Sequence, residues 1–370
     1  MSPTKNTSQA FVTASASSTA TCLPIDPGKN GHLPPEACGV ILLYKPSLAA
    51  AVVFFVLFAL TTLIHFVQVC IHRKLYALVI VMGSGWEFIA MACRAMETRH
   101  QDSSKLYMYF TVFFLVAPIW INAFLYMTLG RMVQFFVPEQ RLVRISARRF
   151  GLIFVCLDIF AFIIQLIGVG ILVQTDAKMD TVMLGVHIYM AGIGIQESFI
   201  VCFLALTIHL HRKLLHMENT GLQPMDKLAR GPFNWRFLFY TLYFSLTMIT
   251  IRIAFRLAEY SKGVGADEPT NTHEWYQYVF DALPMFLAVL ILNVLHPGRI
   301  LQGPDSGFRH AKKMAKMEKK ERRFRQQNPT FGNYGVSDSI PLAPRPTAQA
   351  AVHHEPPQPA YYQPPRSYFL

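Results

Sequence analysis

The sequence predicts an all-α integral membrane protein, a bundle of seven transmembrane helices, and three observations support this fold class. First, 52% of the 370 residues are hydrophobic and 15% are charged, whereas about a quarter of the residues in a soluble domain are charged. Second, seven stretches approach the ~20 consecutive apolar residues that cross a bilayer as a helix. Third, Lys and Arg gather in alternate connecting segments, as expected for a chain that crosses a membrane repeatedly.

The predicted spans are separated by polar or basic segments. We place them near residues 48–70, 75–96, 106–130, 152–173, 184–208, 237–259 and 277–296. Three parts of the chain follow from this placement. They are a disordered extracytoplasmic N-terminus at 1–46, the transmembrane domain at 47–298, and a basic, then Pro-rich, disordered cytoplasmic tail at 299–370.

Basic residues predict the orientation of the bundle. The segments after the first, third, fifth and seventh spans are rich in Lys and Arg, as at Arg73-Lys74, and the alternate segments hold few. Because cytoplasmic loops carry this excess, we predict an extracytoplasmic N-terminus and a cytoplasmic C-terminus. The formal net charge of +12 lies largely on the cytoplasmic side and favours contact with anionic lipid over nucleic acid.

Two candidate modifications fall in the N-terminal segment. Asn6 begins the triplet Asn-Thr-Ser, a glycosylation sequon. Cys22 and Cys38 are the cysteines expected in the oxidising compartment, so a disulfide between them is a candidate. The remaining cysteines lie in or at the ends of spans at no metal-ligand spacing, and we expect no metal site.

The third and fourth spans contain a proline and a buried acid. Pro118 lies in the middle of its span and frees a backbone carbonyl, which Asn122 one turn later could satisfy. Asp158 in the fourth span could pair with Arg131 at the inner end of the third. We therefore expect structural roles at these positions.

Charges are densest in the last two spans. Arg252, Arg256 and Glu259 recur at i, i+4 and i+7 and share one helical face, and Asp281 enters the last span near its start. A charge in hydrocarbon costs at least ~2.5–3.5 kcal/mol on insertion scales, so it pairs inward or lines a polar cavity. An ion-pair clamp and the wall of a substrate pathway both fit. We expect one structural cluster in the outer half of the bundle, made of Arg94, Arg252, Arg256, Glu259 and Asp281.

A second group of polar residues is expected near the membrane centre and forms the candidate ligand site. Its members are Glu87, Asn122, Gln165, Gln196 and Glu197. If the outer cluster pairs with itself, the central carboxylates lack cationic partners. A lipid with a cationic amine could complete them, its tail lying among Phe, Leu and Met side chains. A protonated glutamic acid would do so without any ligand, because burial disfavours the charged form.

A series of short motifs runs in order through most of the chain outside its two ends. They are Tyr44-x-Pro46-Ser47, Glu87…Arg94, Ala117-Pro118…Tyr126…Gly130-Arg131, Asp158…Gln165…Gly168, Gly192…Gln196, Arg252-x-x-Phe255-Arg256-x-x-Glu259 and Glu274…Tyr278…Asp281…Pro284-Met285…His296-Pro297-Gly298. With this series the chain resembles the fungal RTA-like family of seven-span membrane proteins, also called the lipid-translocating exporter family. It departs from the family at Ala90-Met91, where Gly-Tyr is usual.

The resemblance implies a plasma-membrane exporter of amphipathic lipids, such as sphingoid long-chain bases, that confers resistance to toxic amphiphiles and drugs. The sequence itself shows no phosphate-binding glycine loop, no paired metal histidines within a span and no Gly-x-Ser-x-Gly elbow. We therefore expect no cofactor and no enzymatic activity. A seven-span lipid sensor or receptor, which regulates a lipid or stress response without transport, is the alternative.

Overall fold

The computed structural model describes the membrane-spanning part of the chain and a few residues on either side. The described residues are 23, 25–26, 28, 33, 37, 44–101, 103–143, 145–172, 178–221, 234–261, 273–301, 317 and 320. The chain divides into two units, Met1–Ala311 and Lys312–Leu370, and the membrane-spanning helices belong to the first. Asn6, Cys22 and Cys38 lie outside the described residues, so the sequon and the disulfide stay predictions.

Seven helical stretches in the described part of the chain are long and apolar enough to cross a membrane, which confirms the predicted fold class. Six of them are α1 (Leu48–His72), α2 (Leu78–Glu97) with the 3₁₀ turn η1 (Leu75–Ala77) before it, α3 (Ser104–Phe136), α4 (Ala147–Leu172), α5 (Met179–Asn219) and α7 (Arg236–Ser261). The seventh is built from α9 (Trp275–Gln277), the π-helix η2 (Tyr278–Ala282), α10 (Leu283–Val294) and α11 (Pro297–Ile300).

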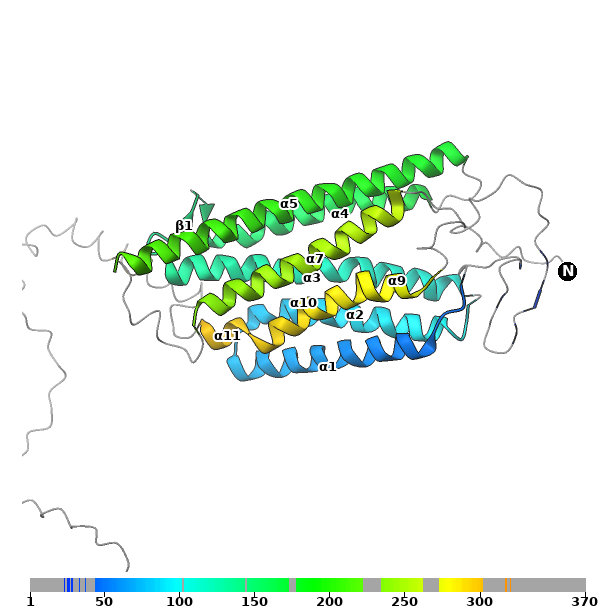
Figure 1. Cartoon of the computed structure of the whole chain (residues 1–370), viewed down its shortest axis with the longest axis horizontal. Helices are drawn as coiled ribbons and strands as arrows, with labels where there is room; N and C mark the ends of the chain where they lie inside the picture. The colour runs from blue at the N-terminus through cyan, green and yellow to red at the C-terminus, as the bar shows by residue number, and fades with distance from the viewer. Residues whose placement is uncertain are drawn as a thin grey trace, which may run out of the picture. The chain divides into compact units, whose positions relative to one another are not determined.

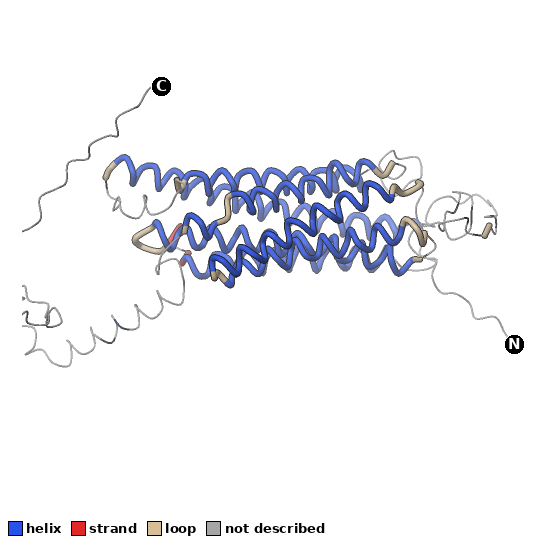
Figure 2. Tube along the Cα trace, turned by 90° about the horizontal axis from the view of Figure 1, so that it is seen from below, coloured by secondary structure: helices blue, strands red, loops and turns tan. Residues whose placement is uncertain are grey.

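Helices that follow one another in the chain lie side by side in the bundle. Contacts join α1 to α2, α2 to α3, α3 to α4, α4 to α5, α5 to α7 and α7 to α10, and α10 returns to α1. These contacts close the seven spans into a ring, and Figures 1 and 2 show the helices running alongside one another in one bundle. The start of α1 and the end of α11 lie at opposite ends of this bundle, while the side of the membrane that each end faces stays a prediction.

A tight hairpin connects α3 to α4. Its strands are β1 (Arg141–Leu142) and β2 (Ile145–Ser146), paired antiparallel with Leu142 opposite Ile145. The connection between these two spans is thus short, so α3 and α4 pack as antiparallel neighbours.

Glycines allow α4 and α5 to approach closely. A Cβ added at Gly168 would lie 2.5 Å from the backbone nitrogen of Tyr189, and one at Gly192 would lie 2.9 Å from that of Gln165. Side chains larger than hydrogen at these positions would push the helices apart. This close approach brings Gln165 of α4 beside Gln196 of α5.

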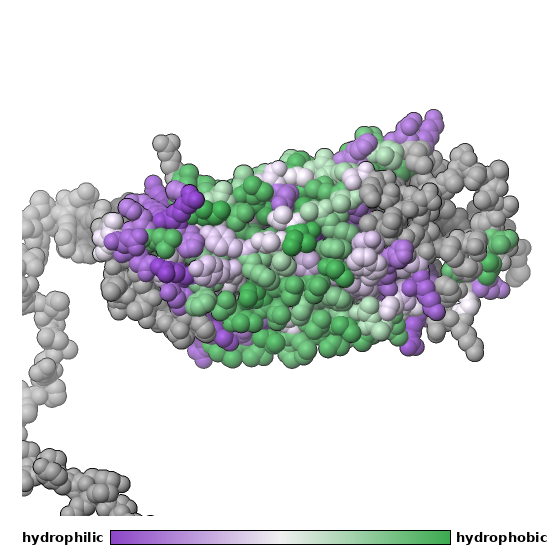
Figure 3. All heavy atoms as spheres, in the orientation of Figure 1, coloured by the Kyte–Doolittle hydropathy of each residue, from purple (hydrophilic) through white to green (hydrophobic). Residues whose placement is uncertain are grey.

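The outer surface of the bundle is apolar along its middle. Figure 3 shows a hydrophobic band over the helices, with hydrophilic residues gathered at the two ends. Large exposed apolar side chains within the spans, such as Leu63, Phe160 and Val201, contribute to this surface. An apolar belt of this kind suits hydrocarbon as its solvent, so the chain is an integral membrane protein.

Candidate functional site

The two arginines that lie one turn apart on α7 converge on one carboxylate of the seventh span. Arg252 Nη1 lies 2.8 Å from Asp281 Oδ1, and Arg256 Nη2 pairs with Asp281 Oδ2. Arg256 Nη1 also lies 3.0 Å from Glu259 Oε2. Asp281 is completely buried, so its two oxygens are satisfied by charge pairing rather than by water.

Local backbone geometry places Asp281 at this point. It lies in η2, a π-helix, and Pro284 follows at the start of α10. A π turn is wider than an α turn and is frequent at functional sites. Proline has no backbone N–H to continue the regular ladder, so an irregular turn beside it is expected.

The proline of α3 has a partner that the sequence did not reveal. Because Pro118 lacks an N–H, the carbonyl of Phe114 has no donor four residues later. Arg252 Nη2 donates a hydrogen bond to this oxygen at 3.0 Å, and its guanidinium lies 4.5 Å from the Phe114 ring centroid. The expectation that Asn122 satisfies the freed carbonyl is therefore wrong.

Asn122 instead faces the buried acid of α4. Asn122 Nδ2 donates to Asp158 Oδ2 at 3.1 Å, and the Tyr126 hydroxyl donates to the same oxygen at 2.9 Å. Asn122 and Tyr126 are four residues apart on one face of α3, so both reach α4. The predicted Asp158–Arg131 pair is wrong, because the Arg131 guanidinium lies over the Tyr76 ring, 3.7 Å from its centroid.

Glu87 of α2 joins the arginines of α7. Its Oε1 lies 3.5 Å from Arg252 Nη1, its side chain is fully buried, and neither oxygen has a hydrogen-bond partner among the described residues. Glu87 was predicted at the candidate ligand site, and the structure places it beside Arg252 instead. We call Glu87, Arg252, Arg256, Glu259 and Asp281 the central network.

A second network lies near the start of α1, and Arg94 belongs to it rather than to the central network. Arg94 Nη1 lies 2.8 Å from Glu97 Oε2, and Arg94 Nη2 lies 3.3 Å from Glu274 Oε1 and 2.5 Å from the Tyr44 hydroxyl. The single cluster predicted from the sequence thus divides into two. We call Arg94, Glu97, Glu274 and Tyr44 the terminal network.

Neutral donors complete the terminal network. The Ser47 backbone N–H donates to Glu274 Oε2 at 2.6 Å, and the Tyr278 hydroxyl donates to Oε1 at 3.0 Å. Burial raises the pKa of the Tyr44 hydroxyl, against the opposing effect of Arg94, so this group stays protonated at neutral pH. Tyr44 and Glu274 belong to the motif series but lie outside the predicted apolar stretches, so a search for charges within spans missed them.

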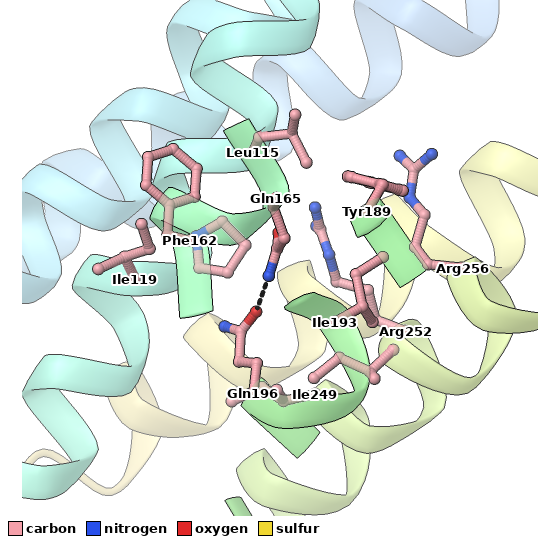
Figure 4. Close-up of a pocket in the computed structure, with 12 residues that line it drawn as sticks. Leu115, Ile119, Phe162, Gln165, Tyr189, Ile193, Gln196, Ile249, Arg252 and Arg256 are labelled. Carbon is pink, nitrogen blue, oxygen red and sulfur yellow. Dashed lines mark hydrogen bonds between the residues drawn. The ribbon is translucent and has the colours of Figure 1, made fainter. Parts of the chain in front are cut away.

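A small cavity lies between α3, α4, α5 and α7. Gln165 Nε2 donates to Gln196 Oε1 at 2.9 Å across it, and the Arg252 guanidinium points toward the same space (Figure 4). The cavity measures about 40 Å³, room for a few water-sized groups. Its lining consists of Leu115, Pro118, Ile119, Phe162, Gln165, Tyr189, Ile193, Gln196, Ile249, Arg252, Ile253 and Arg256.

Glu197 follows Gln196 on α5 but is not among the residues that line the cavity. It is half-buried, its Oε1 accepts a hydrogen bond from Thr250 Oγ1 at 2.9 Å, and its Oε2 has no hydrogen-bond partner among the described residues. The predicted ligand site is therefore dispersed. Only Gln165 and Gln196 meet, while Glu87, Asn122 and Glu197 have separate surroundings.

These features define a seven-span integral membrane protein with a polar and charged interior. In the described residues, no three His, Cys, Asp or Glu side chains gather as metal ligands would. The chain belongs to the family described as RTA1 like protein, whose sequence pattern matches residues 80–304.

Curated relatives from fungi match over most of their lengths. The probable lipid transporter atnI of Emericella nidulans is 54% identical over 295 residues, which cover 80% of this chain and 77% of the relative. The sphingoid long-chain base transporter RSB1 of Saccharomyces cerevisiae is 25% identical over 290 residues, 71% of this chain and 75% of the relative. Protein RTA1 of Saccharomyces cerevisiae is 29% identical over 280 residues, 69% and 84% of the two chains. No solved structure matches this chain.

Proposed function

We propose that this protein translocates amphipathic lipids with a cationic headgroup, of the sphingoid long-chain base class, and so protects the cell from toxic amphiphiles. The names of two relatives support this proposal, since one is called a probable lipid transporter and the other a sphingoid long-chain base transporter. A plasma-membrane location, an extracytoplasmic N-terminus and a role other than catalysis belong to the same proposal.

The observation that carries the proposal is the amphipathic lining of the cavity. Gln165 and Gln196 present amide groups on one side, beside the charged central network, and branched apolar side chains such as Ile193 line the rest. At about 40 Å³ the cavity fits an amine and its hydroxyl groups but not a hydrocarbon chain. A long-chain base would place its headgroup there and keep its tail among apolar side chains.

Net charge favours a cation over an anion as the headgroup. Two arginines of the central network face three carboxylates, so the fully ionised network carries one negative charge. Each arginine is already engaged by carboxylates. An ammonium group near this network restores neutrality, whereas a phosphate would add to the excess of negative charge.

Transport in vesicles that contain only the purified protein tests the proposal. Phosphatidylcholine vesicles would be loaded in their inner leaflet with a fluorescent sphingosine whose exposure outside is followed by a membrane-impermeant quencher. We expect faster appearance outside than in protein-free vesicles, with a double variant Gln165→Leu and Gln196→Leu much slower. Binding of sphingosine without movement would favour the sensor or receptor instead, and no binding at all would refute both.

The predicted orientation has its own test. A single cysteine placed at Lys178, just before α5, should react with an impermeant maleimide added to intact cells. A cysteine at position 227 should react only after the cells are permeabilised. The reverse labelling pattern would overturn the predicted orientation without affecting the transport proposal.

A further inference from the structure

Glu87 is the member of the central network that its neighbours leave unsatisfied. The carboxylates of Asp281 and Glu259 each lie within 3.0 Å of an arginine nitrogen, whereas Glu87 Oε1 is 3.5 Å from Arg252 Nη1 and its Oε2 pairs with no arginine among the described residues. A fully buried carboxylate that has neither a hydrogen bond nor a close cation is strongly unfavourable. The excess negative charge of the network therefore resides at Glu87.

The charged groups that act on Glu87 come from two elements. They are Arg252 and Arg256 of α7 and Asp281 of η2, and no charged group of the described residues of α1 or α3 joins them. Addition of one proton to Glu87 makes the network neutral. A proton on Glu87 weakens the longest arginine pair of the network, at 3.5 Å, whereas a proton on Asp281 or Glu259 weakens a pair of 3.0 Å or less.

Arg252 connects this acid to the cavity. Its Nη1 faces Glu87 and Asp281, its Nη2 donates to the carbonyl of Phe114, and the side chain also lines the cavity that holds Gln165 and Gln196. A change of charge on Glu87 therefore changes how fully the guanidinium beside the cavity is compensated. The coupling acts through one side chain and needs no long path.

We propose that Glu87 is a proton-binding site whose occupation excludes a cationic headgroup from the cavity, so that the protein exchanges lipid for protons. With Glu87 ionised, the network is negative and an ammonium makes it neutral. With Glu87 protonated, the network is already neutral, and a bound ammonium would leave one uncompensated positive charge in the membrane interior. Each lipid that enters the cavity therefore releases the proton of the Glu87 carboxyl, and the O–H bond re-forms when the lipid leaves.

The inference rests on the proposed function for the nature of the ligand, and calorimetry on the purified wild type in phosphatidylcholine nanodiscs tests it. Sphingosine would be titrated in two buffers of different ionisation enthalpy, so that the released protons are counted. We expect up to about one proton per ligand, and an affinity that falls up to about tenfold for each unit of decrease in pH. N-acetylsphingosine, which is neutral, should bind without either effect.

Protons released on binding can come from Glu87 or from the amine of sphingosine, and the variant Glu87→Gln distinguishes the two sources. Glutamine mimics the protonated acid and has no proton to release. The variant should bind sphingosine more weakly than wild type, without the protein's share of proton release, and should bind N-acetylsphingosine unchanged. If Glu87→Gln does not fold, N,N,N-trimethylsphingosine replaces it as a probe on the wild type, since its charge is fixed and every proton released comes from the protein.

Three outcomes overturn the inference. Wild-type proton release that persists in full in Glu87→Gln would place the site elsewhere. The absence of proton release from wild type with trimethylsphingosine would remove the coupling, yet transport in vesicles would still support the proposed function. If no long-chain base binds under any condition, the proposed function fails together with the inference.

Discussion

The terminal network and the central network have the same kind of charges and differ in how well their acids are satisfied. Arg94 faces Glu97 and Glu274, an excess of one carboxylate, just as the central network has an excess of one. Every acid of the terminal network accepts at least one hydrogen bond, and Glu274 is completed by Ser47 and Tyr278. Glu87 accepts none.

This difference indicates a structural role for one network and a ligand-binding role for the other. A buried acid that is fully hydrogen-bonded holds its neighbours in one geometry and gains little from a further partner. A buried acid that has neither hydrogen bonds nor a close cation gains most from a proton or an added cation. We therefore interpret the terminal network as the tie that joins the segment before α1 to the ends of α2 and α9, and the central network as the part that responds to ligand.

The largest effect is expected when a carboxylate that bridges two arginines is removed. Asp281→Ala leaves Arg252 and Arg256 buried with too few partners, a loss of roughly 3–5 kcal/mol. Arg252→Ala should fall in the same range, because it removes the arginine paired with Glu87, one of the two arginines paired with Asp281 and the donor to the freed carbonyl of Phe114. Folded yield after size-exclusion chromatography measures both.

Asp180→Ala is the matched control for these substitutions, because this acid is exposed in the first turn of α5. Its yield should equal that of wild type. Wild-type yield for Asp281→Ala would show that the central network does not hold the bundle together.

The terminal network should respond less to the loss of one neutral partner. Tyr44→Phe removes the hydroxyl that accepts from Arg94 but leaves both acid partners, so we expect a loss of about 1–3 kcal/mol. The thermal unfolding midpoint in detergent should fall, and long-chain base binding should stay at the wild-type level. A large drop in binding without a change in unfolding temperature would show that the terminal network takes part in ligand binding.

Much of the fold could be predicted from the sequence, because every backbone polar group inside the hydrocarbon must be hydrogen-bonded within the protein. Seven apolar stretches must be helices, since only helices satisfy their own backbone in lipid. The ends of the spans were less well defined. α3 continues to Phe136 and α5 to Asn219, past the apolar stretches that predicted them, because a helix does not have to end where the hydrocarbon does.

Partners of the buried charges could not be read in the same way. Hydropathy places Arg94, Glu87 and Arg252 at depths along their spans but not at angles around the ring. The structure shows that a single side chain, Arg252, contacts α2, α3 and η2 at once. Asp158 Oδ2 accepts hydrogen bonds from Asn122 and Tyr126, neutral residues that a count of charges overlooks.

The smallest effect on stability, and the most specific effect on function, is expected at Glu197. It differs from Glu87 by being half-buried and by accepting a hydrogen bond from Thr250, which glutamine can keep. Glu197→Gln should therefore change stability by no more than about 0.5 kcal/mol. We propose that its second oxygen contacts the amine of an approaching lipid, since this oxygen has no hydrogen-bond partner among the described residues.

Cells that express Glu197→Gln should lose tolerance to a cationic amphiphile while the abundance of the protein stays unchanged. Thr250→Val is the informative companion, because it removes the hydrogen bond and keeps the acid, so tolerance should persist. Purified wild type and Glu197→Gln would then be compared for binding of sphingosine across pH. Equal binding would assign Glu197 to packing between α5 and α7 and leave the cavity and Glu87 as the ligand-responsive part. Weaker binding that keeps the wild-type pH dependence would place Glu197 on the entry path, separate from the proton site at Glu87.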